Sequence, residues 1–98
     1  MLGGAYQIEV DTPFGRKPGL VVIRTDGDVG TVEIDAPLVG KQRLEVRVEG
    51  DSFTAEGTFK MKLVGKLSYA LAGQVEDDEL RVSIASSKGT FELTGKRV

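Results

Sequence analysis

The residues best suited to contact a ligand are two tyrosines and one arginine in a chain of 98 residues. Tyr6 and Tyr69 fall on the apolar phase of alternating stretches, where a buried phenol needs a hydrogen-bond partner and can serve the polar group of a ligand. Arg24 follows an apolar run, and a guanidinium in the mouth of an enclosed site suits a carboxylate. The alternatives stay open. The tyrosines can be core residues bonded to the backbone, and Arg24 can be an ordinary surface residue, since unpaired buried charge is costly.

Catalytic and metal chemistry has few residues to work with. The chain contains no Cys and no His, which removes thiolate chemistry, the commonest general base and the commonest metal ligand. Asp26-Gly27-Asp28 and Asp77-Asp78 offer carboxylates, but their spacing does not match the calcium loop of an EF-hand, and we interpret them as solvated turns. Because no paired carboxylates fall on an inner phase, we expect a protein that is not an enzyme and has no metal or cofactor.

The charges are nearly balanced, with 13 Lys and Arg against 15 Asp and Glu. Lys60, Lys62 and Lys66 cluster around one turn, but Glu56 lies among them and no exposed aromatic platform accompanies them, which favours a solvated face over a nucleic-acid site. No apolar run approaches the roughly 20 residues that span a bilayer, and the first residues lack the pattern of a signal peptide. We therefore predict a cytoplasmic protein with no nucleic-acid or membrane partner.

The stretch from Ser52 to Val75 gives the clearest indication of the fold. Apolar and polar residues alternate along it on both sides of a turn at Gly65, which predicts two antiparallel strands, each with a buried face and a wetter one. The same period of two predicts six further strands, at residues 5–12, 20–25, 29–36, 43–49, 80–84 and 91–97. The segment 43–49 is the most regular, since Leu44, Val46 and Val48 alternate with charged residues.

Turns rich in Gly, Pro and Asp separate the predicted strands. Asp26-Gly27-Asp28 predicts a type I′ hairpin turn, in which both central residues need positive φ, and the segment from Pro13 to Pro18 is predicted to be a loop. Acidic turns recur at 26–28, 49–51 and 76–78, so the chain is a succession of hairpins. We predict one all-β domain over residues 1–98, an antiparallel meander of about eight strands closed as a small barrel. A two-sheet β-sandwich is the alternative.

The predicted inner phases also define a candidate binding site. A barrel of eight strands is either filled by its own side chains or holds one small ligand. The candidate ligand-binding residues, in the barrel interior or at its mouth, are Arg24 and the aromatic residues of the inner phases: Tyr6, Phe53, Phe59, Tyr69 and Phe91.

The second predicted strand is apolar on both of its faces. Either Val21 and Ile23 or Leu20 and Val22 must point outward, and the sequence leaves open which pair does. Together with outward Ala70 and Ala72, the outward pair predicts an apolar strip suited to a homodimer through the outer face of Leu20-Ile23. The alternative is that a terminus or a loop covers that strip.

The succession of short strands, the two segments Gly57-Thr58-Phe59 and Gly89-Thr90-Phe91, and the closing Gly95-Lys96-Arg97 resemble small bacterial proteins with a calycin-like, lipocalin-like barrel. The resemblance extends over residues 5–97 and transfers no functional residue, and the Gly-x-Trp signature of true lipocalins is missing because the chain has no Trp. It implies a barrel with a tendency to bind ligands. We therefore predict a non-enzymatic barrel that binds a small apolar molecule, and the alternative is a dimeric assembly module with a packed, ligand-free interior.

Overall fold

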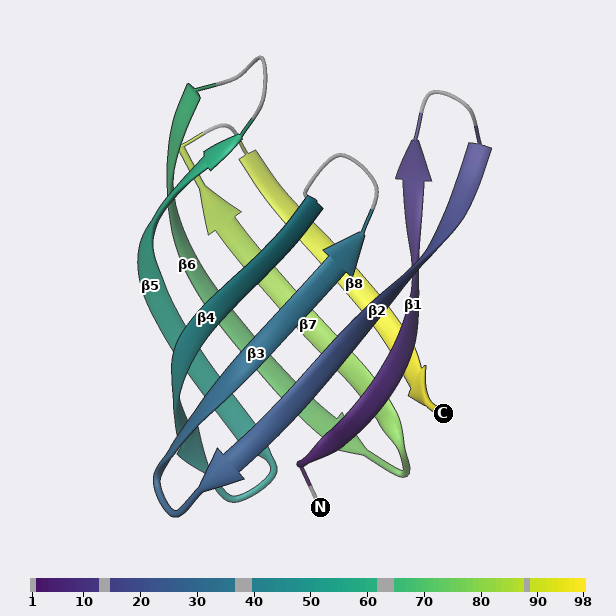
Figure 1. Cartoon of the computed structure of the whole chain (residues 1–98), viewed down its shortest axis with the longest axis vertical. Helices are drawn as coiled ribbons and strands as arrows, with labels where there is room; N and C mark the ends of the chain where they lie inside the picture. The colour runs from purple at the N-terminus through teal and green to yellow at the C-terminus, as the bar shows by residue number, and fades with distance from the viewer. Residues whose placement is uncertain (1, 13–14, 37–39, 62–64, 88) are drawn as a thin grey trace.

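The computed structural model describes residues 2–12, 15–36, 40–61, 65–87 and 89–98, without the side chains of Asp11, Thr12, Phe59, Lys60, Met61, Leu67 and Phe91. The described residues form eight antiparallel strands, and β8 pairs back to β1, so the sheet closes into a barrel (Figure 1). The predicted all-β barrel is confirmed, and the two-sheet sandwich is wrong because hydrogen-bonded pairing runs around the whole ring. The strands are β1 Gly4–Thr12, β2 Gly15–Asp26, β3 Val29–Ala36, β4 Gly40–Glu49, β5 Ser52–Met61, β6 Gly65–Glu76, β7 Glu79–Ser86 and β8 Gly89–Arg97. These residues contain no helix that is long and apolar enough to cross a membrane.

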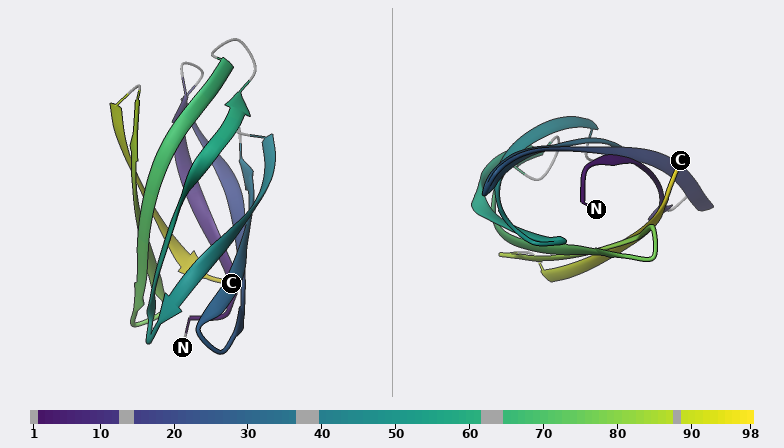
Figure 2. Two further views of the ribbon diagram at one scale, coloured as in Figure 1. Left: turned by 90° about the vertical axis from the view of Figure 1, so that its left-hand side faces the viewer. Right: turned by 90° about the horizontal axis from the view of Figure 1, so that it is seen from below.

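The two ends of the barrel differ. One end, which we call the closed end, carries the turns at 27–28, 50–51 and 77–78 and both chain termini (Figure 1). Seen from below, the strands form a flattened ring with the N-terminus inside its outline (Figure 2). Leu2 is only 4% exposed and belongs to the same apolar cluster as Tyr6, so the first residues cover this end of the core. We call the opposite end, where β1 stops and β2 starts, the split end.

The alternation of apolar and polar residues determines which side chains enter the barrel. On β4, Val46 is buried and Leu44 and Val48 are half-buried, whereas Arg43 and Arg47 are exposed, as predicted. The large apolar side chains on the predicted inner phases are buried or half-buried wherever the structure describes them. The fully buried members are Tyr6, Ile8, Val32, Ile34, Val46, Phe53, Leu71, Leu80 and Val82.

The structure determines which face of β2 points inward. Val21 and Ile23 are each 2% exposed and point inward, and Leu20 on the opposite phase is 43% exposed. The predicted loop from Pro13 to Pro18 is wrong from Gly15 onward, because β2 begins at Gly15 and Pro18 pairs with Glu9. Pro13 and Phe14 lie outside the described residues. Pro18 is tolerated there because its nitrogen faces the β3 side, where the ladder between β2 and β3 begins only at Leu20.

The turn types also differ from the prediction. At the hairpin between β2 and β3 the central residues are Gly27 and Asp28, and of these two only Gly27 has positive φ, at 67°. A single positive φ at the first central position is typical of a type II′ turn. The pattern of two positive φ values occurs instead at Asp77 and Asp78, with φ of 52° and 63°, since Asp tolerates the left-handed region better than most residues.

The chain consists of two similar halves, which we call the first half-sheet (β1–β4) and the second half-sheet (β5–β8). Their strands contain 9, 12, 8 and 10 residues and 10, 12, 8 and 9 residues. The amide of Val48 donates to Asp28 O and that of Arg97 donates to Asp78 O, both at 2.9 Å. The acidic turns at 26–28 and 76–78 occupy equivalent places in the two halves, and the acidic turn at 49–51 joins the halves.

The two half-sheets meet along two short ladders. β4 pairs with β5 over three residue pairs and ends at Arg47–Thr54, and β1 pairs with β8 over three pairs and ends at Ile8–Gly95. The other six ladders contain 7 to 10 pairs. Both short ladders lie at the closed end, so the half-sheets are joined there and separate toward the split end, as β1 and β8 do in Figure 1.

The register explains where the ladder between β4 and β5 stops. Beyond Arg47–Thr54 the next facing pairs would be Val46–Ala55 and Glu45–Glu56. Glu45 and Glu56 are both exposed on the outer face, and like charges directly opposite each other destabilise antiparallel pairing. Repulsion between these two carboxylates therefore opposes further closure of the seam.

Candidate ligand-binding site

On β6 and β7 the inner face of the barrel changes from closely packed to accessible toward the split end. On β6 Leu71 is buried and Tyr69 is half-buried, and on β7 Val82 is buried and Ile84 is half-buried. Six apolar or aromatic inner side chains on the split-end side of the core share this intermediate exposure: Val10, Leu44, Ala55, Tyr69, Ile84 and Leu93. They come from six strands of both half-sheets and form a continuation of the core that water can reach.

Tyr69 is the polar member of this inner surface. Gly57 faces it in the ladder between β5 and β6, and a Cβ built on Gly57 would lie 3.2 Å from the Tyr69 hydroxyl oxygen. The tyrosine ring therefore occupies the space that a side chain at position 57 would take. Burial raises the pKa of Tyr69 above its ordinary value of 10.0, so the hydroxyl is neutral at physiological pH and can donate a hydrogen bond.

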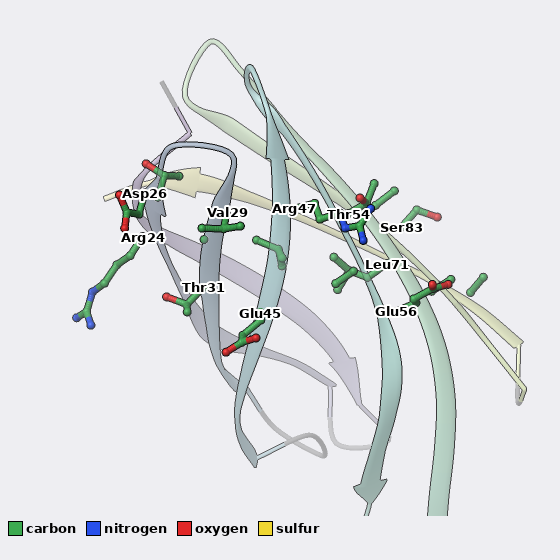
Figure 3. A pocket seen from close by; sticks show the side chains of 17 residues that line it. Arg24, Asp26, Val29, Thr31, Glu45, Arg47, Thr54, Glu56, Leu71 and Ser83 are labelled. Carbon is green, nitrogen blue, oxygen red and sulfur yellow. The ribbon is translucent and has the colours of Figure 1, made fainter.

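A groove of about 1150 Å³ lies where β4 and β5 separate. Its lining includes inner residues, Val46, Ala55 and Leu71, as well as outer residues on both sides, among them Glu45 and Glu56. In Figure 3 the Leu71 side chain is seen between the ribbons of β4 and β5. The opening of this seam therefore brings the apolar inner surface into contact with the outside.

The seam between β1 and β8 has a smaller equivalent. A groove of about 450 Å³ lies beside it and includes Gln7, Glu9, Thr94 and Lys96, with Gly95 among its lining residues. The equivalence follows from the repeat, since the ladders of both seams stop after three pairs. The wider groove between β4 and β5 is the better entrance for a ligand.

The closed end is held by a cluster around Tyr6 and Arg97. The Tyr6 hydroxyl donates to Leu2 O at 2.7 Å, and Arg97 donates from Nη1 to Gly3 O at 2.6 Å and from Nε to Asp78 Oδ1 at 2.8 Å. The guanidinium carbon lies 4.9 Å from the centre of the Tyr6 ring, within the range of a cation–π contact. Burial raises the pKa of Tyr6, and the nearby charge of Arg97 acts in the opposite direction.

The structure separates the residues that the sequence grouped as one site. Tyr6 and Phe53 are 0% and 2% exposed and lie in the closed end, so they are core residues there, and Tyr6 bonds to the backbone. Tyr69 alone among the predicted residues with a described side chain lies on the accessible inner surface. The side chains of Phe59 and Phe91 lie outside the described residues.

Arg24 does not enter the barrel and is a surface residue, which is the alternative that the sequence left open. Because Val21 and Ile23 take the inner positions, Arg24 falls on the outer phase, where its side chain is 70% exposed and lies 3.7 Å from Glu33. It lines the outer side of the groove between β4 and β5. Ala70 and Ala72 also line this groove, whereas Leu20 and Val22 do not, so the apolar strip stays a prediction.

The sequence analysis missed Glu45 and Glu56, the residues that face each other across the open seam. Each was assigned to the polar phase of its strand, which is correct. The signal that identifies them is the register of the β4–β5 hairpin, because counting back from the turn at 50–51 places the two carboxylates opposite each other. The opposition of Glu45 and Glu56 becomes apparent only when β4 and β5 are aligned.

Metal binding has no support among the residues that the structure describes, since no three acidic side chains there are grouped to hold an ion. The sequence matches no protein-family model, no curated protein and no solved structure at a significant level.

Proposed function

We propose that this protein is a non-enzymatic binding protein that takes a small, largely apolar molecule between its two half-sheets at the split end. The observation that carries the proposal is the half-burial of six inner side chains from six strands on the split-end side of the core. Apolar side chains that stay accessible inside a closed sheet gain free energy when a ligand removes them from water, at about 25 cal/mol per Å².

The geometry of the seam supports an entry path from the side. The groove of about 1150 Å³ reaches Val46, Ala55 and Leu71 from the outside, so a ligand need not pass through the connections at the split end. Tyr69 is the polar residue of the inner surface that such a ligand would contact. The resemblance to calycin-like barrels, which tend to bind ligands, points in the same direction.

The test is a screen of fatty acids, aromatic compounds and isoprenoids by native mass spectrometry and thermal shift, followed by variants of the inner surface. Ala55→Phe should abolish binding of a hit because it fills the inner surface beside the seam. Thr90→Phe adds the same ring on the exposed outer phase of β8 and should leave binding unchanged.

Two results would count against small-ligand binding. One is the absence of any hit together with a crystal structure in which the split end is dry and completely packed. The other is a hit whose affinity falls equally in the Ala55→Phe and Thr90→Phe variants, since that would place the ligand outside the barrel.

The alternative of a dimeric assembly module stays a prediction. Its supporting observation is Leu20, which is 43% exposed, next to half-buried Val22 on the outer face of β2. Sedimentation at micromolar concentration tests it. The alternative predicts a dimer that Leu20→Lys converts to a monomer, and a wild-type monomer would exclude it at that concentration.

A further inference from the structure

The open seam between β4 and β5 presents the backbone edges of two strands. The N–H and C=O groups of one strand residue point to the same side of the strand, and the side alternates from residue to residue. The amide of Val48 donates to Asp28 O in the direction of β3. Arg43 and Glu45 lie an odd number of residues from Val48, so their backbone N–H and C=O groups point toward β5.

The facing edge of β5 follows from the same alternation. The amide of Val75 donates to Asp51 O, so Asp51 is oriented toward β6, and the groups of Glu56 and Thr58 point toward β4. Within the described ranges 40–49 and 52–61, the pairing between β4 and β5 stops at Arg47–Thr54. Two unsatisfied edges therefore face the same opening, and such edges favour the addition of another strand.

We infer that this seam binds an extended peptide segment as an additional strand between β4 and β5, with apolar residues alternating with polar ones and one basic residue at the level of Glu45 and Glu56. The inference goes beyond the binding of a small molecule, because it rests on backbone edges and on charges at the seam. The basic residue follows from charge complementarity, since the outward side chain at that level would lie between Glu45 and Glu56, whereas exposed Arg43 at the next level favours a neutral side chain.

The apolar residues of the peptide follow from the inner side of the seam. Inserted side chains that point inward would meet Leu44, Ala55 and Leu71, which are half-buried or line the groove.

The test uses a defined probe, the acetylated and amidated peptide Val-Thr-Val-Lys-Val-Thr-Val, titrated into the ¹⁵N-labelled protein and followed by NMR. The expected result is saturable shifts at the amides of Arg43, Glu45, Glu56 and Thr58, together with slower hydrogen exchange at these four positions. Two control peptides separate the contributions. N-methylation of alternate residues removes the backbone donors, and replacement of the Lys by Glu reverses the charge, and both changes should remove binding.

Protein variants test the charged pair independently. Glu45→Gln and Glu56→Gln should each lower the affinity for the lysine peptide about fivefold, the size of a favourable exposed ion pair, while Glu92→Gln on the outer face of β8 should change nothing. The proposal is overturned if the four edge amides do not respond at about 1 mM peptide, a concentration that detects even weak complexes. Equal binding of the N-methylated or the glutamate peptide would also overturn it. Neither result bears on small apolar ligands, which need no strand edge.

Discussion

The role of Tyr6 could not be determined from its residue type alone. A phenol on an inner phase suits either a ligand or the backbone, and the sequence left both open. The Tyr6 hydroxyl donates a hydrogen bond to Leu2 O, and the Arg97 guanidinium lies over the Tyr6 ring. The side chain therefore connects the start of the chain to its end. Tyr69, with the same residue type and phase, lies instead at the accessible side of the core.

Alkaline pH should weaken the fold through these two tyrosines. Burial raises the pKa of both above 10.0, so the folded state keeps these protons at a pH where the unfolded chain has begun to lose them. The contribution of the two tyrosines to the free energy of unfolding should therefore be fully present below about pH 10 and be lost as the pH rises through the folded-state pKa values. Urea denaturation at a series of pH values measures this dependence.

The variants Tyr6→Phe and Tyr69→Phe identify the source of that effect. Each should reduce the loss of stability above pH 10, and Tyr6→Phe should also cost about 1 kcal/mol at neutral pH because the hydrogen bond to Leu2 O is lost. If the double variant loses as much stability above pH 10 as the wild type does, the tyrosines are not responsible.

Substitution of Gly73 should destabilise the protein because the Phe53 ring lies beside it. It faces Phe53 in the ladder between β5 and β6, and a Cβ built on it would lie 2.6 Å from Phe53 Cε1. Gly73→Ala should therefore lower the free energy of unfolding by about 1–3 kcal/mol, the usual cost of overpacking a core. Thermal denaturation provides the measurement.

A double-mutant cycle shows whether the ring is the cause. In a Phe53→Leu background, Gly73→Ala should cost much less, because the smaller side chain leaves room for the added methyl group. Gly57→Ala should be milder than Gly73→Ala, since its nearest contact, the Tyr69 hydroxyl at 3.2 Å, can yield. An equal cost of Gly73→Ala in both backgrounds would mean that strain elsewhere limits this position.

At the scale of elements, the seam between β4 and β5 depends on which charges its register brings together. Glu56→Lys would replace the opposed pair Glu45–Glu56 by an attractive one, and the ladder should then extend past Arg47–Thr54. We expect the free energy of unfolding to rise by about 0.5 kcal/mol, measured by urea denaturation, and binding of the lysine peptide to disappear. Glu92→Lys, the same change on β8, should produce neither effect.

How well the elements could be predicted depended on how polar their outer faces are. β4 alternates apolar and charged residues, so its inner face could be assigned from the sequence. β2 is apolar on both phases over Leu20–Ile23, and only its pairing with β1 and β3 determines that Val21 and Ile23 point inward. The same local pattern gave Arg24 no definite side, which is why it was included in the predicted site.

At the scale of the whole molecule, the barrel could be predicted but its opening could not. Alternation and turn spacing give the number and order of the strands, because both are local properties of the chain. The two short seams are a property of the complete ring, since they depend on the alignment of β4 with β5 and of β1 with β8. The predicted site therefore mixed core residues of the closed end with Tyr69, and it missed Glu45 and Glu56.

Amide hydrogen exchange along β4, followed residue by residue by NMR, tests most directly whether the half-sheets separate at this seam. Leu44 and Val46 point their amides toward β3 and should be protected, whereas the amides of Arg43 and Glu45 point into the seam and should exchange rapidly. Equal protection at all four positions would mean that β4 and β5 are paired along their whole length. It would remove both the side entrance and the free edges on which the proposed binding sites depend.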